Sequence, residues 1–279
     1  MPFVNVGQEN SSDIYLYYED HGRGKPVVMI HRFPYSGHAW EKEERELLAA
    51  GCRVITYDRR GFGNSSQPSI GYDYDTFVSD LNVLMEKLNL MDTMLVGHSM
   101  GTGEVSHYLG TYGSARVRKA VLVSPIPPFL LKTNDNPQGL DRSLFDGFMK
   151  QIIADRPAFI KFFTDNFYNV DVFRGTRISD QAWQASFNVG VSASAKGTLD
   201  CVPSWLTDFR EDVKKLDVPV MVIQGTEDRI LPIDATGRRL RGMIKDLKYV
   251  EIEGGPHGIL WTHADKVNPE LMDFIGQKM

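Results

Sequence analysis

The stretch from residue 93 to residue 103 constrains the fold more than any other part of this chain. An apolar run from Met94 to Val96 meets Gly97-His98-Ser99-Met100-Gly101, and a helical pattern follows. This is the G-x-S-x-G pattern in the setting that it requires, a strand turning sharply into a helix. A Cβ atom at either flanking glycine would collide with a neighbouring strand or helix. We therefore expect a strained Ser99 whose hydroxyl projects from the sheet edge above the positive end of the next helix.

Composition limits the partners of the chain. Its 279 residues are 42% hydrophobic and 24% charged, as in a soluble globular protein with a sizeable core. A net charge of −5 gives no reason to expect nucleic acid or an anionic membrane as a partner. No apolar run approaches the roughly 20 residues of a membrane span, and the beginning of the chain does not resemble a signal peptide. Two distant cysteines, Cys52 and Cys201, indicate a reducing, cytoplasmic location, and no ligand cluster or phosphate loop indicates a metal or cofactor.

Short apolar segments alternate with amphipathic segments along most of the chain. This alternation predicts an α/β fold with a mostly parallel sheet, helices on both faces and antiparallel leading strands. Strands are expected at residues 3–6, 14–19, 27–30, 53–57, 94–96, 117–124, 218–224 and 249–252. Helices are expected at residues 38–49, 74–88, 233–243 and from 264 onward.

The alternation stops between residues 125 and 217. This segment is rich in aromatic residues at helical spacing, with breakers between them. An apolar helical layer outside the sheet has to bury itself over something, so we interpret 125–217 as a helical cap. The core domain would then comprise residues 1–124 and 218–279. A plain second domain distant from the site is the alternative.

A serine hydroxyl is a poor nucleophile unless a base accepts its proton and an acid orients that base. In enzymes with this elbow, the acid and then the base follow the nucleophile in the chain. The acidic candidates are Glu227 and Asp228, directly after the strand that ends at Gln224. We select Asp228, because it precedes the apolar segment 230–232, whereas Glu227 alternates away and is expected to be solvated.

His257 is the candidate base. It follows the last strand in Gly254-Gly-Pro-His-Gly258, where glycine and proline predict a rigid, exposed loop that presents an imidazole. The rival, His263, lies near the start of the final helix, and the side chain of His98 is expected to point away from Ser99. His21, His38 and His107 are interpreted as ordinary surface or core residues.

The negative oxygen that forms during acyl transfer needs two backbone donors. The N–H of Met100, which starts the elbow helix, is one candidate, and the N–H of Phe33, in the loop after strand 27–30, is the other. This assignment depends only on location in the chain, because backbone donors leave no side-chain signature. Both residues are also compatible with a pocket-lining role.

These residues together resemble the α/β-hydrolase superfamily, and within it the cofactor-free bacterial haloperoxidases (perhydrolases), whose relatives include esterases and a γ-lactamase. The resemblance covers nearly the whole chain and is carried by Tyr57–Ser65, Gly71–Phe77, Gly97–Val105, Lys132–Pro137, Thr207–Arg210 and Gly255–His263. It implies an eight-stranded sheet, a four-helix cap and oligomers of varied size. It also implies an acyl-enzyme on Ser99, from which water releases an acid and hydrogen peroxide releases a peracid. The peracid would oxidise halide away from the protein, without haem or metal.

The sequence departs from the family pattern at two positions. The family usually has glycine before the oxyanion aromatic, whereas this chain has Arg32. If that position requires a positive φ, arginine costs on the order of 1 kcal/mol in strain. Its side chain either enters the pocket and attracts a carboxylate, or points outward without effect. Thr226 replaces a frequent aspartate and should leave Asp228 unaffected, while Pro34 after Phe33 is associated with perhydrolysis in such enzymes.

The favoured function is hydrolysis of small carboxylic esters, with perhydrolase activity. A γ-lactamase acting on cyclic amides is the close alternative, and a receptor that binds in the pocket without reacting is a remote one. A structural protein that uses the aromatic cap as an interface is a further possibility. The pocket is expected to accept a small hydrophobic acyl group, and its expected lining is Phe33, Pro34, Met100, Phe129, Trp205, Ile230 and Trp261.

Overall fold

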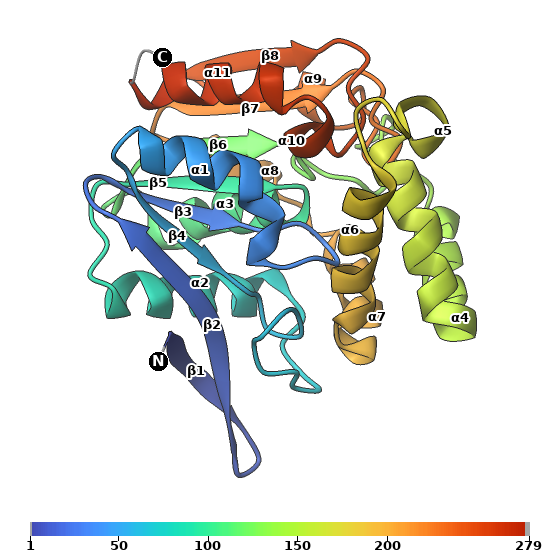
Figure 1. The fold of residues 1–279 in the computed structure, drawn as a ribbon, viewed down its shortest axis with the longest axis horizontal. Coiled ribbons are helices and arrows are strands. Elements are labelled where there is room, and N and C mark those ends of the chain that lie inside the picture. Colours follow the sequence, from blue (N-terminus) through green and yellow to red (C-terminus); the bar gives the residue numbers. More distant parts are fainter. Residues whose placement is uncertain (1, 277–279) are drawn as a thin grey trace.

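The computed structural model describes residues 2–276, and within them eight strands form one sheet in the order β1-β2-β4-β3-β5-β6-β7-β8 (Figure 1). The first two strands are antiparallel to their neighbours, and all later strands are parallel, as predicted. The strands are β1 (Phe3–Glu9), β2 (Ser12–Gly22), β3 (Pro26–Ile30), β4 (Arg53–Tyr57), β5 (Thr93–His98), β6 (Val117–Val123), β7 (Val220–Gly225) and β8 (Leu247–Ile252).

Helices follow most of the parallel strands. They are the 3₁₀ helix η1 (Gly37–Trp40), α1 (Glu41–Ala49), α2 (Tyr74–Lys87), α3 (Met100–Tyr112), α4 (Arg142–Tyr168), α5 (Val170–Phe173), α6 (Asp180–Ser192), α7 (Ala195–Ser204), α8 (Arg210–Lys214), α9 (Gly237–Leu240), α10 (Ile259–Thr262) and α11 (Ala264–Ile275). The prediction of a helix over 74–88 is confirmed almost to the residue. The helix begins at Tyr74 because Asp73 caps it by accepting the Thr76 N–H.

Two hydrophobic cores lie on opposite faces of the sheet. In β3, Val28 and Ile30 belong to the larger core, which includes side chains of α2, α3 and the cap segment. Val27 and Met29 belong to the second core, with side chains of α1 and α11. Burial on both faces is the reason why this strand is continuously apolar in sequence.

The helix predicted over residues 233–243 is wrong in length, because only α9 (Gly237–Leu240) is helical there. Thr236 has a non-helical backbone, with φ −130° and ψ −96°. The N–H of Gly237 donates to the side chain of Gln224 at 3.1 Å, and the Thr236 hydroxyl contacts the same side chain. Hydrogen bonds to a buried strand residue therefore replace those of a regular helical turn.

The segment between β6 and β7 contains α4 to α8, and its helices α4 to α7 lie at the carboxyl ends of the parallel strands (Figure 1). Asp155 has a non-helical backbone just before Pro157, so α4 consists of two helical pieces across a kink. The short α8 contacts the core helix α3, where Asp212 Oδ2 lies 2.8 Å from His107 Nδ1. The division of the chain at residues 124 and 217 remains a prediction.

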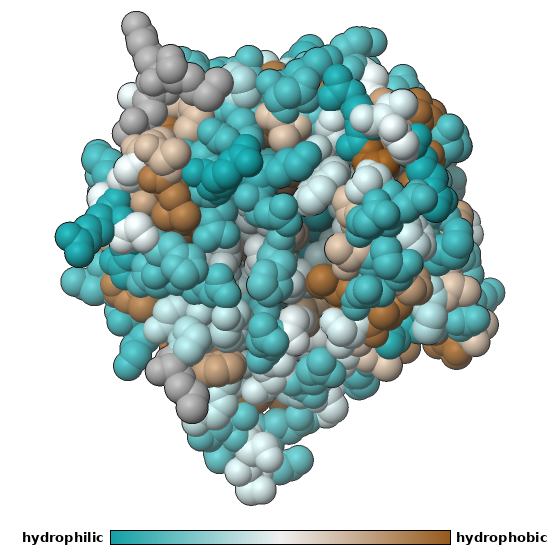
Figure 2. Space-filling view, in the orientation of Figure 1, coloured by the Kyte–Doolittle hydropathy of each residue, from teal (hydrophilic) through white to brown (hydrophobic). Residues whose placement is uncertain are grey.

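The face of the molecule in Figure 2 is mostly hydrophilic, with hydrophobic patches over the cap helices at the right of the view and further ones at the left. Large apolar side chains on α4 and α5 are exposed, namely Leu144, Ile153, Phe162 and Val172. None of the helices in the described part of the chain is both long enough and apolar enough to cross a membrane.

Candidate active site

The elbow has the strained geometry that its sequence predicts. Ser99 has φ 54° and ψ −118°, in a region that non-glycine residues rarely occupy. A Cβ on Gly97 would lie 2.4 Å from the carbonyl oxygen of Gly101. A Cβ on Gly101 would lie 2.3 Å from the carbonyl oxygen of Ile30 in β3. The expectation that both positions require glycine is confirmed.

Hydrogen bonds on both sides hold the backbone of Ser99. Its N–H donates to the carbonyl of Val123 in β6 at 2.8 Å, and its carbonyl accepts from the N–H of Thr102 at 2.9 Å. The Thr102 hydroxyl donates to the same carbonyl at 2.5 Å and accepts from the N–H of Ile126 at 3.0 Å. The conformation of Ser99 is therefore determined by the sheet, by α3 and by the start of the cap segment. The serine is buried, with 5% of its surface exposed.

Asp228 accepts hydrogen bonds at both carboxylate oxygens. Oδ1 accepts from the N–H groups of Ile230 at 3.0 Å and Leu231 at 2.8 Å. Oδ2 accepts from Gln224 Nε2 at 3.2 Å and from His257 Nδ1 at 2.7 Å. Glu227 is exposed, as predicted. The loop after β7 thus turns Asp228 inward and fixes its side chain in one orientation.

The prediction that His257 lies on an exposed loop is wrong, because its side chain has no exposed surface. The ring of Phe167, at the end of α4, lies 5.0 Å from the imidazole, and the Phe167 carbonyl accepts the N–H of Gly258 at 2.8 Å. The cap segment therefore covers a loop that the local sequence presents as exposed. A buried imidazole is screened from water, which strengthens its electrostatic interactions.

The hydrogen bond to Asp228 also determines the tautomer of His257. A carboxylate can only accept, so the proton of the neutral ring is on Nδ1. Nε2 is buried and has no hydrogen-bond partner among residues 2–276. The His257 carbonyl accepts from His98 Nε2 at 3.1 Å, and the two rings lie 5.3 Å apart. This contact holds His257 against the residue that precedes Ser99, with an unprotonated nitrogen available to accept a proton.

The other histidines have separate roles. His263 is the N-cap residue of α11 and shares a 2.8 Å hydrogen bond with Thr262, and burial lowers its pKa to about 4. Burial, and then the charge of Arg32, hold the pKa of His98 well below its usual value. His31 Nε2 accepts the N–H of Arg59 at 2.9 Å, and its Nδ1 donates to the carbonyl of Arg32 at 2.8 Å.

The two proposed oxyanion donors lie on the structural elements that the sequence predicted for them. Met100 is the first residue of α3, directly after Ser99, and its carbonyl accepts the Tyr74 hydroxyl at 3.0 Å. Phe33 lies in the loop after β3, where its peptide bond to Pro34 is cis. Both Phe33 and Met100 are buried. Their role as donors remains a prediction.

The predicted pocket residues make different local contacts. Phe33 and Trp205 are in contact, with ring centroids 4.8 Å apart, and Ile230 adjoins Asp228. Trp261 lies elsewhere: it is beside Lys42, whose Nζ is 4.4 Å from its ring, and it lines a cavity with Arg32. Pro34 lies close to α6, 3.3 Å from the position of a Cβ on Gly190.

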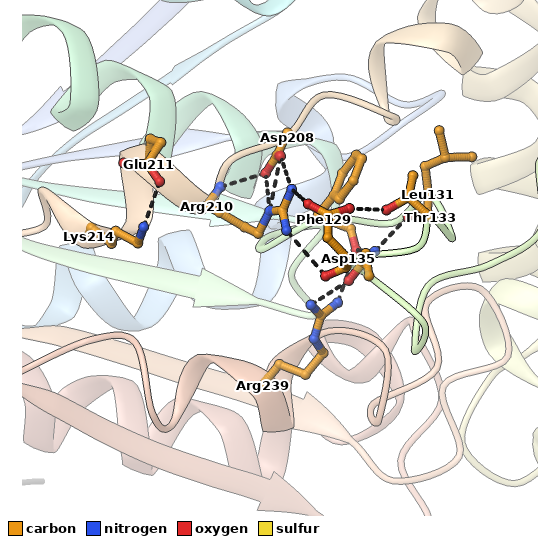
Figure 3. Close-up of polar contacts among 10 residues, drawn as sticks. Phe129, Leu131, Thr133, Asp135, Asp208, Arg210, Glu211, Lys214 and Arg239 are labelled. Atoms are coloured by element: carbon orange, nitrogen blue, oxygen red, sulfur yellow. Dashed lines mark hydrogen bonds and ion pairs between the residues drawn. The ribbon is translucent and has the colours of Figure 1, made fainter.

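Phe129 is held by a polar network at the start of the cap segment (Figure 3). Its ring lies 5.0 Å from the guanidinium of Arg210, which also pairs with Asp208 and Asp135. Its carbonyl accepts from Asn136 Nδ2 at 3.1 Å and from Arg239 Nη1 at 3.1 Å. These contacts connect the first cap loop to the start of α8, through Arg210, and to α9, through Arg239. Phe129 is buried here, and its contribution to the pocket remains a prediction.

The expectations about Arg32 are corrected by the structure. Arg32 is not among the residues with positive φ, so the predicted backbone strain is absent. Its side chain does not point outward either, because only 4% of its surface is exposed. The guanidinium lies over the rings of Tyr35 at 4.8 Å and Phe167 at 4.9 Å. Cation–π contacts of this kind stabilise a buried arginine, and here they connect the loop after β3 to α4.

Gln224 and Thr226 support the site, a role that the sequence did not predict for either residue. The Gln224 amide donates to Asp228 and to the carbonyl of Leu231, the latter at 2.7 Å. The Thr226 hydroxyl accepts the N–H of Gly254 at 2.9 Å and so joins the aspartate loop to the histidine loop. A polar residue at the end of an apolar strand, four positions before the acid, was the available signal for Gln224.

Three side chains of the types that bind metals lie together on β2 and α1. Glu19 and His21 of β2 and Glu44 of α1 place their ligand atoms within 4.8 Å of one another. These side chains are exposed or half-buried, and His21 Nε2 is 3.2 Å from Glu19 Oε2. Exposed acidic groups are common without a bound metal, and none of these three residues makes a hydrogen bond or ion pair with Ser99, Asp228 or His257 in the described part of the chain.

Comparison with known proteins agrees with this fold. A family model described as "alpha/beta hydrolase fold" matches residues 25–264. A Synechocystis sp. protein provisionally named as a non-heme chloroperoxidase is 63% identical, covering 99% of this chain and 100% of that protein. A "Bifunctional esterase/perhydrolase DCH" from Acinetobacter calcoaceticus is 34% identical, covering 93% of this chain and 95% of that protein. The crystal structure of bromoperoxidase from Bacillus anthracis superimposes with a TM-score of 0.94 and 44% identity, covering 99% of both chains.

Proposed function

Because the chain belongs to the alpha/beta hydrolase fold family, in the group of non-heme haloperoxidases and esterases, we propose that it is a serine esterase with perhydrolase activity. The proposed substrates are small carboxylic esters, cleaved through an acyl-enzyme on Ser99. The observation that carries the proposal is the buried 2.7 Å hydrogen bond between His257 Nδ1 and Asp228 Oδ2, beside the strained elbow.

In the proposed reaction, the hydroxyl oxygen of Ser99 attacks the ester carbonyl while Nε2 of His257 accepts its proton. Asp228 keeps the imidazole in the required tautomer and stabilises the imidazolium that forms. His257 then gives the proton to the departing alkoxide, so the alcohol leaves and the acyl group stays on Ser99. Four hydrogen bonds to Asp228 support this role, because they fix the carboxylate that orients the histidine.

The N–H groups of Met100 and Phe33 are proposed to stabilise the negative oxygen of each tetrahedral intermediate. His257 then accepts a proton from the second nucleophile, which attacks the acyl group and restores the Ser99 hydroxyl. Water releases a carboxylic acid, and hydrogen peroxide releases a peracid. The name of the Acinetobacter relative, an esterase and perhydrolase, supports both outcomes for a site of this kind.

The test is hydrolysis of p-nitrophenyl acetate and butyrate, with and without hydrogen peroxide, by the wild type, Ser99→Ala and Ser106→Ala. Ser106 is the matched control, because it is a buried serine of α3, the helix that follows Ser99, and its hydroxyl has no hydrogen-bond partner among the described residues. We expect Ser99→Ala to lose at least about a thousandfold in kcat and all peracid formation. Ser106→Ala should retain both, and all three proteins should melt similarly.

Retention of more than a few per cent of activity by a folded Ser99→Ala variant would overturn the assignment of the nucleophile. Serine-dependent opening of a γ-lactam without ester turnover would replace the ester with a cyclic amide. Absence of turnover on every substrate by the wild type would favour a pocket that binds without reacting.

A further inference from the structure

Arg32 is a buried cation that lacks an acidic partner. Two other buried arginines are paired with carboxylates, Arg59 with Glu104 and Arg60 with Asp80. No carboxylate oxygen among residues 2–276 lies within 4.0 Å of the nitrogen atoms of Arg32. An unpaired charge in a protein interior costs several kcal/mol, and the cost falls when an anion is bound beside it.

The groups that contact Arg32 are all uncharged. Its Nη1 donates to the carbonyl of Ala39 at 3.1 Å, and its Nη2 lies 3.5 Å from the hydroxyl of Tyr168. Its Nε is buried and has no hydrogen-bond partner among the described residues. Each terminal guanidinium nitrogen carries two N–H groups, so Nη1 and Nη2 each keep one further N–H for a ligand.

Glu43 is the acidic residue that responds most to Arg32, but it does not provide a negative charge at neutral pH. The carboxyl group is 1% exposed, and burial raises its pKa to about 8 against the opposing effect of Arg32. Below that pH the protonated form predominates. The positive charge of Arg32 is then balanced by dipoles and aromatic faces alone.

A cavity of about 120 Å³ adjoins Arg32, between the 31–40 loop and α6. Its lining combines the polar groups of Arg32, Tyr168 and Ser186 with apolar surface from Ala182, Val189 and Trp261. The hydroxyls of Tyr168 and Ser186 are joined by a 2.8 Å hydrogen bond. Exposed His38 and Glu41 also belong to the lining. A cavity of this volume and polarity fits a small molecule with one anionic end and a short hydrocarbon part.

We propose that this space, the Arg32 cavity, binds a short-chain monocarboxylate. Its carboxylate pairs with Arg32, and its hydrocarbon part lies against Ala182, Val189 and Trp261. Lys42, with Nζ 4.4 Å from the Trp261 ring, adds a second positive charge nearby, and Glu41 is the one opposing acidic group of the lining. Ser99, Asp228 and His257 do not line this cavity, so carboxylate binding does not depend on turnover.

The test is calorimetric binding of sodium butyrate, and of its neutral analogue butyramide, to a Ser99→Ala protein at slightly acid pH. We expect butyrate to bind and butyramide to bind at least about tenfold more weakly, because a charge-assisted hydrogen bond is lost. Adding Arg32→Met should weaken butyrate binding by at least about tenfold. Adding Ala182→Leu should also weaken butyrate binding by at least about tenfold, because the larger side chain fills the apolar part of the cavity without altering the 31–34 loop.

Several results would overturn the proposal. One is a butyrate affinity that does not change in a folded Arg32→Met or in the Ala182→Leu protein. Others are a butyramide affinity equal to that of butyrate, and the absence of any butyrate binding. If Arg32→Met does not fold, the butyrate affinity of the Ala182→Leu protein tests the proposal in its place. Displacement of butyrate by an equal concentration of bromide would overturn the assignment to carboxylates. Failure of ester hydrolysis would leave these binding results intact, so the two proposals are distinguishable.

Discussion

The carboxylate of Asp228 and the imidazole of His257 form a 2.7 Å hydrogen bond in which neither side chain has any exposed surface. Water cannot compete for either group at that position, so the bond is stronger than a comparable pair at the surface. The other oxygen atom of Asp228 is occupied by two backbone N–H groups of its own loop. The acidic residue is therefore fixed by the fold before any substrate arrives.

Asp228→Asn should lower kcat for p-nitrophenyl butyrate by about three to four orders of magnitude, because an amide does not hold the same tautomer of His257. Glu227→Gln is the matched control, since Glu227 is the exposed acidic neighbour. It should retain near wild-type kcat. Steady-state kinetics at saturating ester checks both. Comparable losses in the two variants would show that general loop damage, and not the aspartate, causes the effect.

Gly101→Ala should abolish activity and destabilise the fold, because its Cβ would lie 2.3 Å from the Ile30 carbonyl and neither backbone can withdraw freely. Gly147→Ala in α4 is the control, since a Cβ there meets nothing within 4 Å. Alanine at that helical position should stabilise the protein by about 0.5–1 kcal/mol. Thermal melting and ester hydrolysis report both effects. A Gly101→Ala protein with normal activity would contradict the close packing at the elbow.

Glu104→Gln should reduce the free energy of unfolding by about 3–5 kcal/mol. Glu104 is wholly buried, accepts the hydroxyl of Tyr57 at 2.5 Å and pairs with the guanidinium of Arg59. Removing its charge leaves Arg59 unbalanced inside the core. Glu211→Gln, at an exposed ion pair with Lys214, should change stability by less than about 1 kcal/mol. Urea unfolding of the two variants measures the contrast, and similar losses would argue against the buried pair.

Glu43→Gln should change how stability depends on pH. Burial raises the pKa of Glu43 from 4.5 to about 8, so the folded protein keeps a proton that the unfolded chain releases at lower pH. The stability from this group is full below pH 4.5 and falls as pH rises towards 8, at up to about 1.4 kcal/mol per unit. Glutamine does not titrate.

The melting temperature of Glu43→Gln should therefore rise relative to that of the wild type between mildly acid and mildly alkaline pH. Glu41→Gln, an exposed neighbour in the first turn of the same helix, is the control and should follow the wild type. Melting curves recorded across this range check the prediction. Parallel curves for Glu43→Gln and the wild type would show that Glu43 is ionised in the folded state.

Much of the fold was predictable because its signals are local. Each of the eight strands overlaps a predicted segment, since a strand buried on both faces is a short continuous apolar run. The elbow was predictable for a related reason, because two glycines around a serine between a strand and a helix describe a specific backbone path. The error at 233–243 arose where a distant side chain, Gln224, competes for the backbone N–H groups.

The site was predictable in its residue types and not in its environment. Asp228 and His257 follow strand ends, and parallel strands bring such loops to one edge of the sheet, so their meeting could be anticipated. The burial of His257 under Phe167 could not be anticipated, because Phe167 lies 90 positions earlier in the chain, within the cap segment. Periodicity shows that a helix has an apolar face, but it does not show which loop that face covers.

The sequence by itself determined the order of strands, the strained serine turn, and the positions of a candidate acid and a candidate base after later strands. Only the tertiary structure decided that His257 is wholly buried and that Arg32 is held inside, next to a cavity. The physical reason is the separation along the chain over which each kind of interaction acts. Backbone geometry and apolar periodicity act over a few residues, whereas Arg32 reaches Tyr168 across 136 positions of the chain, a contact that exists only after the cap has packed on the sheet.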